Sequence, residues 1–199
     1  MHQTDSDLPA LISSRICHDL AGPLMAIANG LELLEMSGLG ALPEATLLSD
    51  SVKAARARME FFRIAYGSAS ATAALSSAKC ANVIKDNFGE RKISVQWLVA
   101  GDLPRSEAKL AFLLAQCCES AIAGRGSLDI ERTSAGWQLR ATAERMNDIG
   151  PLWTVLSDGT GQVSSAEVHF SLAAATAKAQ GLRMTVDRND GMLTLTASA

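Results

Sequence analysis

The sequence predicts an α+β protein in which an N-terminal helical hairpin precedes an α/β sandwich. Three observations support this fold class. Apolar residues recur at helical spacing up to Ala65, an uncharged stretch rich in small residues follows at 66–78, and strand-like alternation appears only after it. We therefore place a domain boundary in this stretch, with a helical domain at 1–70 and an α/β domain at 78–199.

The hairpin is predicted from two helices. The first covers 8–38, with Pro9 near its start and Gly38 at its end, and the second covers 43–65. Their short connection favours antiparallel packing. Because a lone hairpin buries little apolar surface, we expect two copies to pair as a four-helix bundle, which makes the protein a homodimer through residues 8–70.

The remainder alternates helices and strands. Apolar and polar residues alternate at 92–99, as in a strand, and Ser164 and Glu167 have the spacing of a capping box. The other expected elements are helices at 79–90, 104–123 and 164–180, a hairpin of strands at 127–132 and 137–143, and a C-terminal hairpin turning at Asn189-Asp190-Gly191.

Composition narrows the class of protein. Apolar residues make up 48% and charged residues 20% of the 199 positions, as in globular chains. The net charge of −3 is spread along the chain, so no nucleic-acid-binding surface is expected. Residues 1–9 are polar and acidic, unlike a signal peptide, and no apolar run reaches the roughly 20 residues that span a bilayer. We expect a cytoplasmic protein with no membrane partner.

The cysteines do not indicate a metal site. Cys17, Cys80, Cys117 and Cys118 lack CxxC spacing, and the three histidines form no ligand cluster with them. Adjacent cysteines on a helix point about 100° apart. We interpret all four as small buried hydrophobic residues in a reducing compartment and expect no bound metal.

His18 is the histidine whose position in the first helix suggests a functional role. On a helical wheel it lies about 160° from the centre of the apolar stripe of the first helix, so its imidazole is expected to be exposed. Its neighbours one turn away are Ser14, Arg15, Ala21 and Gly22. The stripe itself, predicted to be the core seam, consists of Ile12, Ile16, Leu20, Leu24, Ile27, Leu31 and Leu34.

An exposed imidazole is what a phosphoryl carrier requires. Its nitrogen must attack an aspartyl phosphate in line, so a whole partner domain has to reach it. Asp19 is placed to orient the ring and hold a proton on the other nitrogen, and Arg15 to offset charge on the transferred group. The competing interpretation of His18 is an ordinary surface histidine on an amphipathic helix.

The face around His18 suggests a docking surface for a partner. Gly22, Met25, Ala26 and Asn29 continue it along the first helix, with Ser14 on the other side. On the second helix, Arg56, Arg58 and Arg63 are candidates for contacting an acidic rim around the aspartyl phosphate of the partner domain. These arginines also fit a solvated helix face, for example with Arg56 and Glu60 as an i,i+4 ion pair.

The run His18-Asp19-Leu20-x-x-Pro23-Leu24-x-x-Ile27 resembles the H-box of sensor histidine kinases, in which the histidine is phosphorylated. The similarity continues through Gly30-Leu31-Glu32-Leu33-Leu34-Glu35 and Phe61-Phe62-Arg63-Ile64-Ala65-Tyr66-Gly67. Together these segments resemble the ChpT family of histidine phosphotransferases of alphaproteobacteria.

This resemblance implies a dimer built like a histidine kinase, with a four-helix bundle and degenerate ATPase-type domains that bind no ATP, hence no cofactor. It also implies that phosphate passes from the receiver domain of a CckA-like hybrid kinase to CtrA-like and CpdR-like response regulators of the cell cycle.

The residues of a working ATP site are not apparent. Where a kinase has the asparagine that helps hold magnesium, the nearest candidates here are Gln116 and Glu119. The run Asp158-Gly159-Thr160-Gly161 matches a glycine-rich ATP motif only superficially and is interpreted as a turn. Without these residues no autokinase activity is expected. Gly22 stands where kinases with phosphatase activity carry Asn or Thr, so phosphatase activity is not expected either.

Three alternatives remain at this point. The chain is a histidine kinase with a divergent ATP site, or a non-catalytic dimeric adaptor in which His18 is incidental. A weaker alternative is a serine kinase of the anti-sigma type, which also needs an ATP site.

Overall fold

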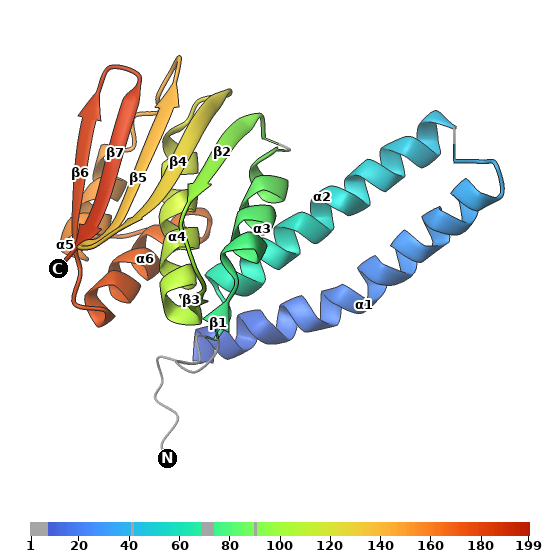
Figure 1. Ribbon diagram of the computed structural model, residues 1–199, viewed down its shortest axis with the longest axis horizontal. Coiled ribbons are helices and arrows are strands. Elements are labelled where there is room, and N and C mark those ends of the chain that lie inside the picture. Colours follow the sequence, from blue (N-terminus) through green and yellow to red (C-terminus); the bar gives the residue numbers. More distant parts are fainter. Residues whose placement is uncertain (1–7, 41, 69–73, 90) are drawn as a thin grey trace. The chain divides into compact units, whose positions relative to one another are not determined.

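The computed structural model describes residues 8–40, 42–68, 74–89 and 91–199. The chain divides into two compact units, Met1–Ala69 and Ser70–Ala199. Figure 1 shows the first as a pair of helices and the second as a sheet with helices packed on it. The α+β class is therefore confirmed.

The hairpin consists of α1 (Leu8–Met36) and α2 (Pro43–Ala65), which lie side by side and antiparallel (Figure 1). Gly38 follows α1 with a φ of +78°, and the backbone N–H groups of Gly38 and Leu39 donate to the carbonyls of Glu35 and Leu34. A left-handed residue at this place closes a helix and favours glycine. Pro43 opens α2, where its missing N–H costs no hydrogen bond.

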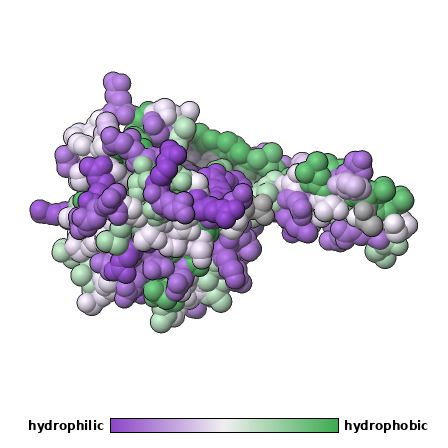
Figure 2. Space-filling model, turned by 90° about the horizontal axis from the view of Figure 1, so that it is seen from above, coloured by the Kyte–Doolittle hydropathy of each residue, from purple (hydrophilic) through white to green (hydrophobic). Residues whose placement is uncertain are grey.

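The predicted core seam of α1 is not covered within one chain. The buried residues of α1 are Cys17, Ala28 and Leu31, while Ile16 and Ile27 remain 53% and 50% exposed. Figure 2 shows hydrophobic residues in green on the surface of the hairpin. Two helices share a single mutual face, so a broad apolar stripe on each leaves a second face open. Of the predicted seam, Ile12, Ile16, Leu20, Ile27 and Leu34 are exposed, Leu24 is intermediate and Leu31 is buried.

The second unit contains a five-stranded sheet of order β2-β4-β5-β7-β6. β2 runs parallel to β4, and the other neighbouring pairs are antiparallel. A short strand, β1, lies in the segment predicted to be a linker and pairs with β3. The strands are β1 (Ala74–Leu75), β2 (Ile93–Leu98), β3 (Leu103–Pro104), β4 (Gly126–Thr133), β5 (Gly136–Ala143), β6 (Arg183–Asn189) and β7 (Met192–Ser198).

Helices cover one face of this sheet (Figure 1). They are α3 (Ser77–Gly89), α4 (Arg105–Ala121), α5 (Gly150–Asp158) and α6 (Val168–Ala179), the last preceded by a 3₁₀ turn at Ser165–Glu167. The predicted capping box is present, because the Ser164 N–H donates to the Glu167 carboxylate at 3.0 Å. The alternating burial of β4 and β5 places Leu128, Ile130 and Leu139, all fully buried, in the core.

The short helix α5 was not predicted. Its nine residues begin with Gly150-Pro151 and end at Asp158, and Gly159 caps the helix in the left-handed conformation at φ 71°. The run Asp158-Gly159-Thr160-Gly161 is therefore the end of a helix, in keeping with the expected turn. So short a helix offers too few periods to be recognised in sequence.

All four cysteines are buried free thiols, as expected. Burial raises the pKa of the Cys80 thiol to about 11, which makes the reactive thiolate scarce. Among the described helices, none combines the length and apolarity that crossing a membrane requires.

Candidate phosphotransfer site

His18 lies near the middle of α1 with its side chain 83% exposed, which confirms the predicted orientation. The phase of the helix explains this. The preceding residue, Cys17, is buried on the side facing α2, where Glu60 and Arg63 lie within electrostatic reach of its thiol. Successive helical residues point about 100° apart, so His18 turns away from that contact.

Arg15, His18 and Asp19 form a hydrogen-bonded chain on the surface of α1. The Arg15 Nε donates to Asp19 Oδ2 at 2.7 Å, and His18 Nδ1 lies 3.2 Å from Asp19 Oδ1. The hydrogen bond from His18, followed by that from Arg15, lowers the pKa of the Asp19 carboxyl below its usual value. Asp19 is thus held as a carboxylate with a different partner on each oxygen.

This arrangement distinguishes the two imidazole nitrogens. A carboxylate only accepts hydrogen bonds, so its contact with Nδ1 requires the hydrogen to be on Nδ1. In the neutral ring the lone pair then belongs to Nε2. The site therefore presents Nε2 of an exposed histidine as a nucleophile.

The face of α1 that continues from His18 toward the C-terminal end of the helix carries small or exposed side chains. A Cβ added at Gly22 would meet no atom within 4 Å, and Met25 is 48% exposed. Ala26 and Asn29 are also exposed. Ser14 is half-buried, and its hydroxyl accepts a hydrogen bond from the Ser68 N–H at 3.4 Å.

Two arginines of α2 contact side chains of their own helix. Arg63 Nη2 donates to Glu60 Oε2 at 2.8 Å, so the ion pair of Glu60 within this helix is with Arg63. Arg58 stacks over the Phe62 ring, 5.7 Å from its centroid. Glu60 was missed as a member of this surface, although its i,i+3 spacing to Arg63 was visible in the sequence.

Arg56 lies apart from His18. It lines a small cavity of about 150 Å³ between the two helices, together with Leu31, Glu32 and Glu35. The structure therefore places Arg63 near the level of His18, through its proximity to Cys17, and Arg56 further along the hairpin.

In the second unit, side chains near the C-terminal end of α4 contact neighbouring elements. The Glu119 carboxylate accepts from the Arg91 guanidinium, and Ser120 Oγ lies 3.1 Å from His169 Nε2. Asn147 Nδ2 donates to the Ser120 carbonyl at 3.0 Å. Glu119, a candidate for an ATP site on sequence grounds, is thus held in an ion pair, and His169 links α6 to α4.

His169 should make the second unit sensitive to acid. Burial lowers its pKa to about 4, against smaller opposing effects of the Ala166 backbone and Glu167. The unfolded chain takes up this proton near the ordinary pKa of 6.5, whereas the folded chain does not until about pH 4. The contribution of neutral His169 to the free energy of unfolding is therefore fully present above pH 6.5, and it is lost as the pH falls toward 4. Between pH 7.5 and 5.0 we expect the free energy of unfolding to fall by about 2 kcal/mol because of this residue.

Urea unfolding followed by tryptophan fluorescence tests this, because Trp97, Trp137 and Trp153 all lie in the second unit. A His169→Gln protein should lose about 2 kcal/mol less stability than the parent over the same pH interval. An equal loss in both proteins would contradict the assignment to His169.

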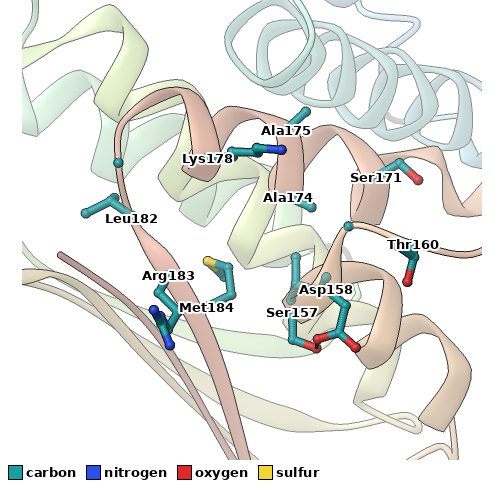
Figure 3. Close-up of a pocket in the computed structure, with 13 residues that line it drawn as sticks. Ser157, Asp158, Thr160, Ser171, Ala174, Ala175, Lys178, Leu182, Arg183 and Met184 are labelled. Atoms are coloured by element: carbon teal, nitrogen blue, oxygen red, sulfur yellow. Dashed lines mark hydrogen bonds between the residues drawn. The ribbon is translucent and has the colours of Figure 1, made fainter.

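An open cavity of about 720 Å³ lies between α5, α6 and β6. Figure 3 shows Lys178 on α6, Arg183 on β6, and Ser157 beside Asp158 at the end of α5. Ser157 Oγ donates to Asp158 Oδ1 at 2.9 Å. The lining of the cavity includes Asp158, Gly159 and Thr160 but neither Gln116 nor Glu119.

Comparison with known proteins places this geometry in a family. The profile of the histidine phosphotransferase C-terminal domain matches residues 77–191. The protein phosphotransferase ChpT of Brucella abortus (strain 2308) is 34% identical over 168 residues, covering 82% of this chain and 80% of that protein.

Similar chains are also found among solved structures. The structure of a bacterial phosphotransferase aligns over 100% of this chain and 98% of its own, with 26% identity and a TM-score of 0.68. The histidine kinase domain of the blue-light-activated kinase from Erythrobacter litoralis EL346 aligns over 95% and 93% of the two chains, with 16% identity and a TM-score of 0.46. By the profile match and the identity to the Brucella protein, the chain belongs to the ChpT-type histidine phosphotransferases.

Proposed function

We propose that this protein relays a phosphoryl group between receiver domains through a phosphohistidine at His18. The observation that carries the proposal is the exposed imidazole whose Nδ1 contacts Asp19, so that Nε2 faces solvent. Family membership supports phosphotransfer in general. The transfer between receiver domains, the role of His18 and the identity of the partners are what this proposal adds.

The proposed step balances between the imidazole and the aspartyl phosphate. The Nε2 lone pair forms an N–P bond while the P–O bond to the receiver aspartate breaks, and that electron pair returns to the aspartate carboxylate. Because Nδ1 keeps its hydrogen, the phosphorylated ring is a cation. Asp19, 3.2 Å from Nδ1, is placed to stabilise that charge. Onward transfer to a second receiver reverses these steps.

We propose that the active form is a homodimer. In the single chain the α1 stripe around Ile16, Leu20 and Ile27 stays half exposed, and α2 adds Leu48 at 53%. Two helical hairpins bury such stripes by forming a four-helix bundle. His18 points to a different side of α1 from this stripe and would stay accessible in the dimer.

The proposed partners are the receiver domain of a CckA-like hybrid kinase and CtrA-like or CpdR-like regulators. They would dock along His18, Gly22 and Met25, with Ala26 and Asn29 at the far end. Open space at Gly22 supports close approach of a partner helix. Arg63 lies near enough to extend the surface onto α2, whereas Arg56 would take part only in a wider footprint.

The test is to mix the purified protein with a receiver domain phosphorylated on aspartate and to follow the label over seconds. Label should move onto this chain as an acid-labile, base-stable phosphoramidate, and a lane with ATP alone should stay blank. No transfer from several receivers would favour the adaptor. Label from ATP alone would reveal a kinase with a divergent nucleotide site.

Docking has its own test. Met25→Glu puts a charge in the centre of the proposed docking surface and should slow transfer about tenfold, as loss of a central contact does. Met36→Glu is the matched control, because Met36 lies on the same side of α1 three turns further and is 84% exposed. It should transfer at the parental rate. Equal rates for Met25→Glu and the parent would refute the docking surface.

A further inference from the structure

We propose that Arg15 is a positioning residue, which anchors Asp19 so that Asp19 keeps the hydrogen of His18 on Nδ1. The inference rests on the proposed function of His18. It differs from the role expected from sequence, in which Arg15 meets the transferred phosphoryl group directly.

The contacts of Asp19 carry the argument. Its Oδ2 accepts from Arg15 Nε at 2.7 Å, and its Oδ1 contacts His18 Nδ1 at 3.2 Å. Adjacent helical residues such as His18 and Asp19 do not naturally face each other, whereas residues four apart do. Arg15 is thus the neighbour whose spacing fixes the carboxylate, and fixing Oδ2 holds Oδ1 beside the imidazole.

Helix stabilisation does not explain this ion pair. Within a helix an acid N-terminal to the base is the favourable order, and here the base comes first. Both residues lie inside α1, away from its ends, so the helix dipole stabilises neither charge. The pair is also exposed, with side chains 76% and 49% accessible, where ion pairs add little to stability.

The two roles of Arg15 make opposite predictions. In the structure the Nε edge of the guanidinium is directed at the Asp19 carboxylate. A residue that acts through Asp19 loses its effect when Asp19 is changed. A residue that contacts the phosphoryl group keeps its effect.

The first experiment is a double-mutant cycle on the single-turnover transfer rate. Arg15→Gln should slow transfer about two- to fivefold, the range that one exposed ion pair supports. Arg15→Lys should restore most of the rate. In an Asp19→Asn background Arg15→Gln should have no further effect. An undiminished effect in that background would overturn the proposal in favour of direct contact.

The second experiment does not depend on phosphotransfer. In ¹⁵N-histidine-labelled protein at alkaline pH, with His18→Ala to identify the signals, the nitrogen shifts report the His18 tautomer. Arg15→Gln should lower the share with hydrogen on Nδ1 about two- to fivefold relative to the other tautomer. Lys53→Gln, which breaks the exposed Lys53–Asp50 pair on α2, should leave it unchanged.

An unchanged tautomer ratio in Arg15→Gln would refute the role of Arg15 even if the parent transfers phosphate normally. A parent that accepts no phosphate would refute the proposed function, while the tautomer measurement would still decide whether Arg15 acts through Asp19.

Discussion

A His18→Ala protein is expected to acquire no label from a phosphorylated receiver, a fall in transfer rate on the order of 10³-fold or more. The physical reason is that the substitution removes the only atom proposed to form the N–P bond, and binding alone cannot replace a nucleophile. The measurement is the time course of label on this chain beside the parent.

Loss of folding would not explain that result. The His18 side chain is 83% exposed, so its removal should change the free energy of unfolding by no more than about 0.5 kcal/mol. Circular dichroism melting of both proteins provides the control. Parental labelling of His18→Ala would place the phosphoryl group elsewhere and end the proposal for this residue.

The second large effect concerns assembly. Ile27→Asp puts a carboxylate in the α1 stripe, where both copies of it would be buried in the four-helix bundle. Burying unpaired charge costs several kcal/mol, so the dimer dissociation constant should rise on the order of 10³-fold. Light scattering after size exclusion should give twice the chain mass of 20.9 kDa for the parent and the chain mass for the variant.

Leu33→Asp is the matched control for Ile27→Asp. Leu33 is also an exposed apolar residue of α1, at 64%, but it lies off the stripe. This variant should remain a dimer. A parent with the mass of a single chain, or equal masses for the parent and Ile27→Asp, would contradict the proposed bundle.

Elements with strong local signals were predictable from sequence. Helix α2 begins at Pro43 as expected, the Ser164–Glu167 capping box forms, and a turn at Asp190-Gly191 joins β6 to β7. Each depends on residues at most a few positions apart, whose interaction is decided by spacing along the chain. Helix α5 lacked such signals over enough turns and was missed.

The candidate site was predictable in part for the same reason. The outward direction of His18 follows from the period of one helix. The choice of Arg63 rather than Arg56 as the partner of Glu60 does not, because both spacings suit an ion pair. Likewise, Arg15 and Asp19 had the right separation, but their hydrogen bond emerges only from side-chain conformations.

The sequence by itself determined the two helices of the hairpin, the α/β character of the remainder and the exposed histidine with its acidic neighbour. The tertiary structure decided the strand order that inserts β7 between β5 and β6, the link from His169 to Ser120, and the exposure of the α1 stripe. The reason is physical. Turn, cap and helix phase depend on neighbours in the chain, whereas strand partners and the burial of a face depend on residues far away in sequence, whose pairing is selected by packing the whole core.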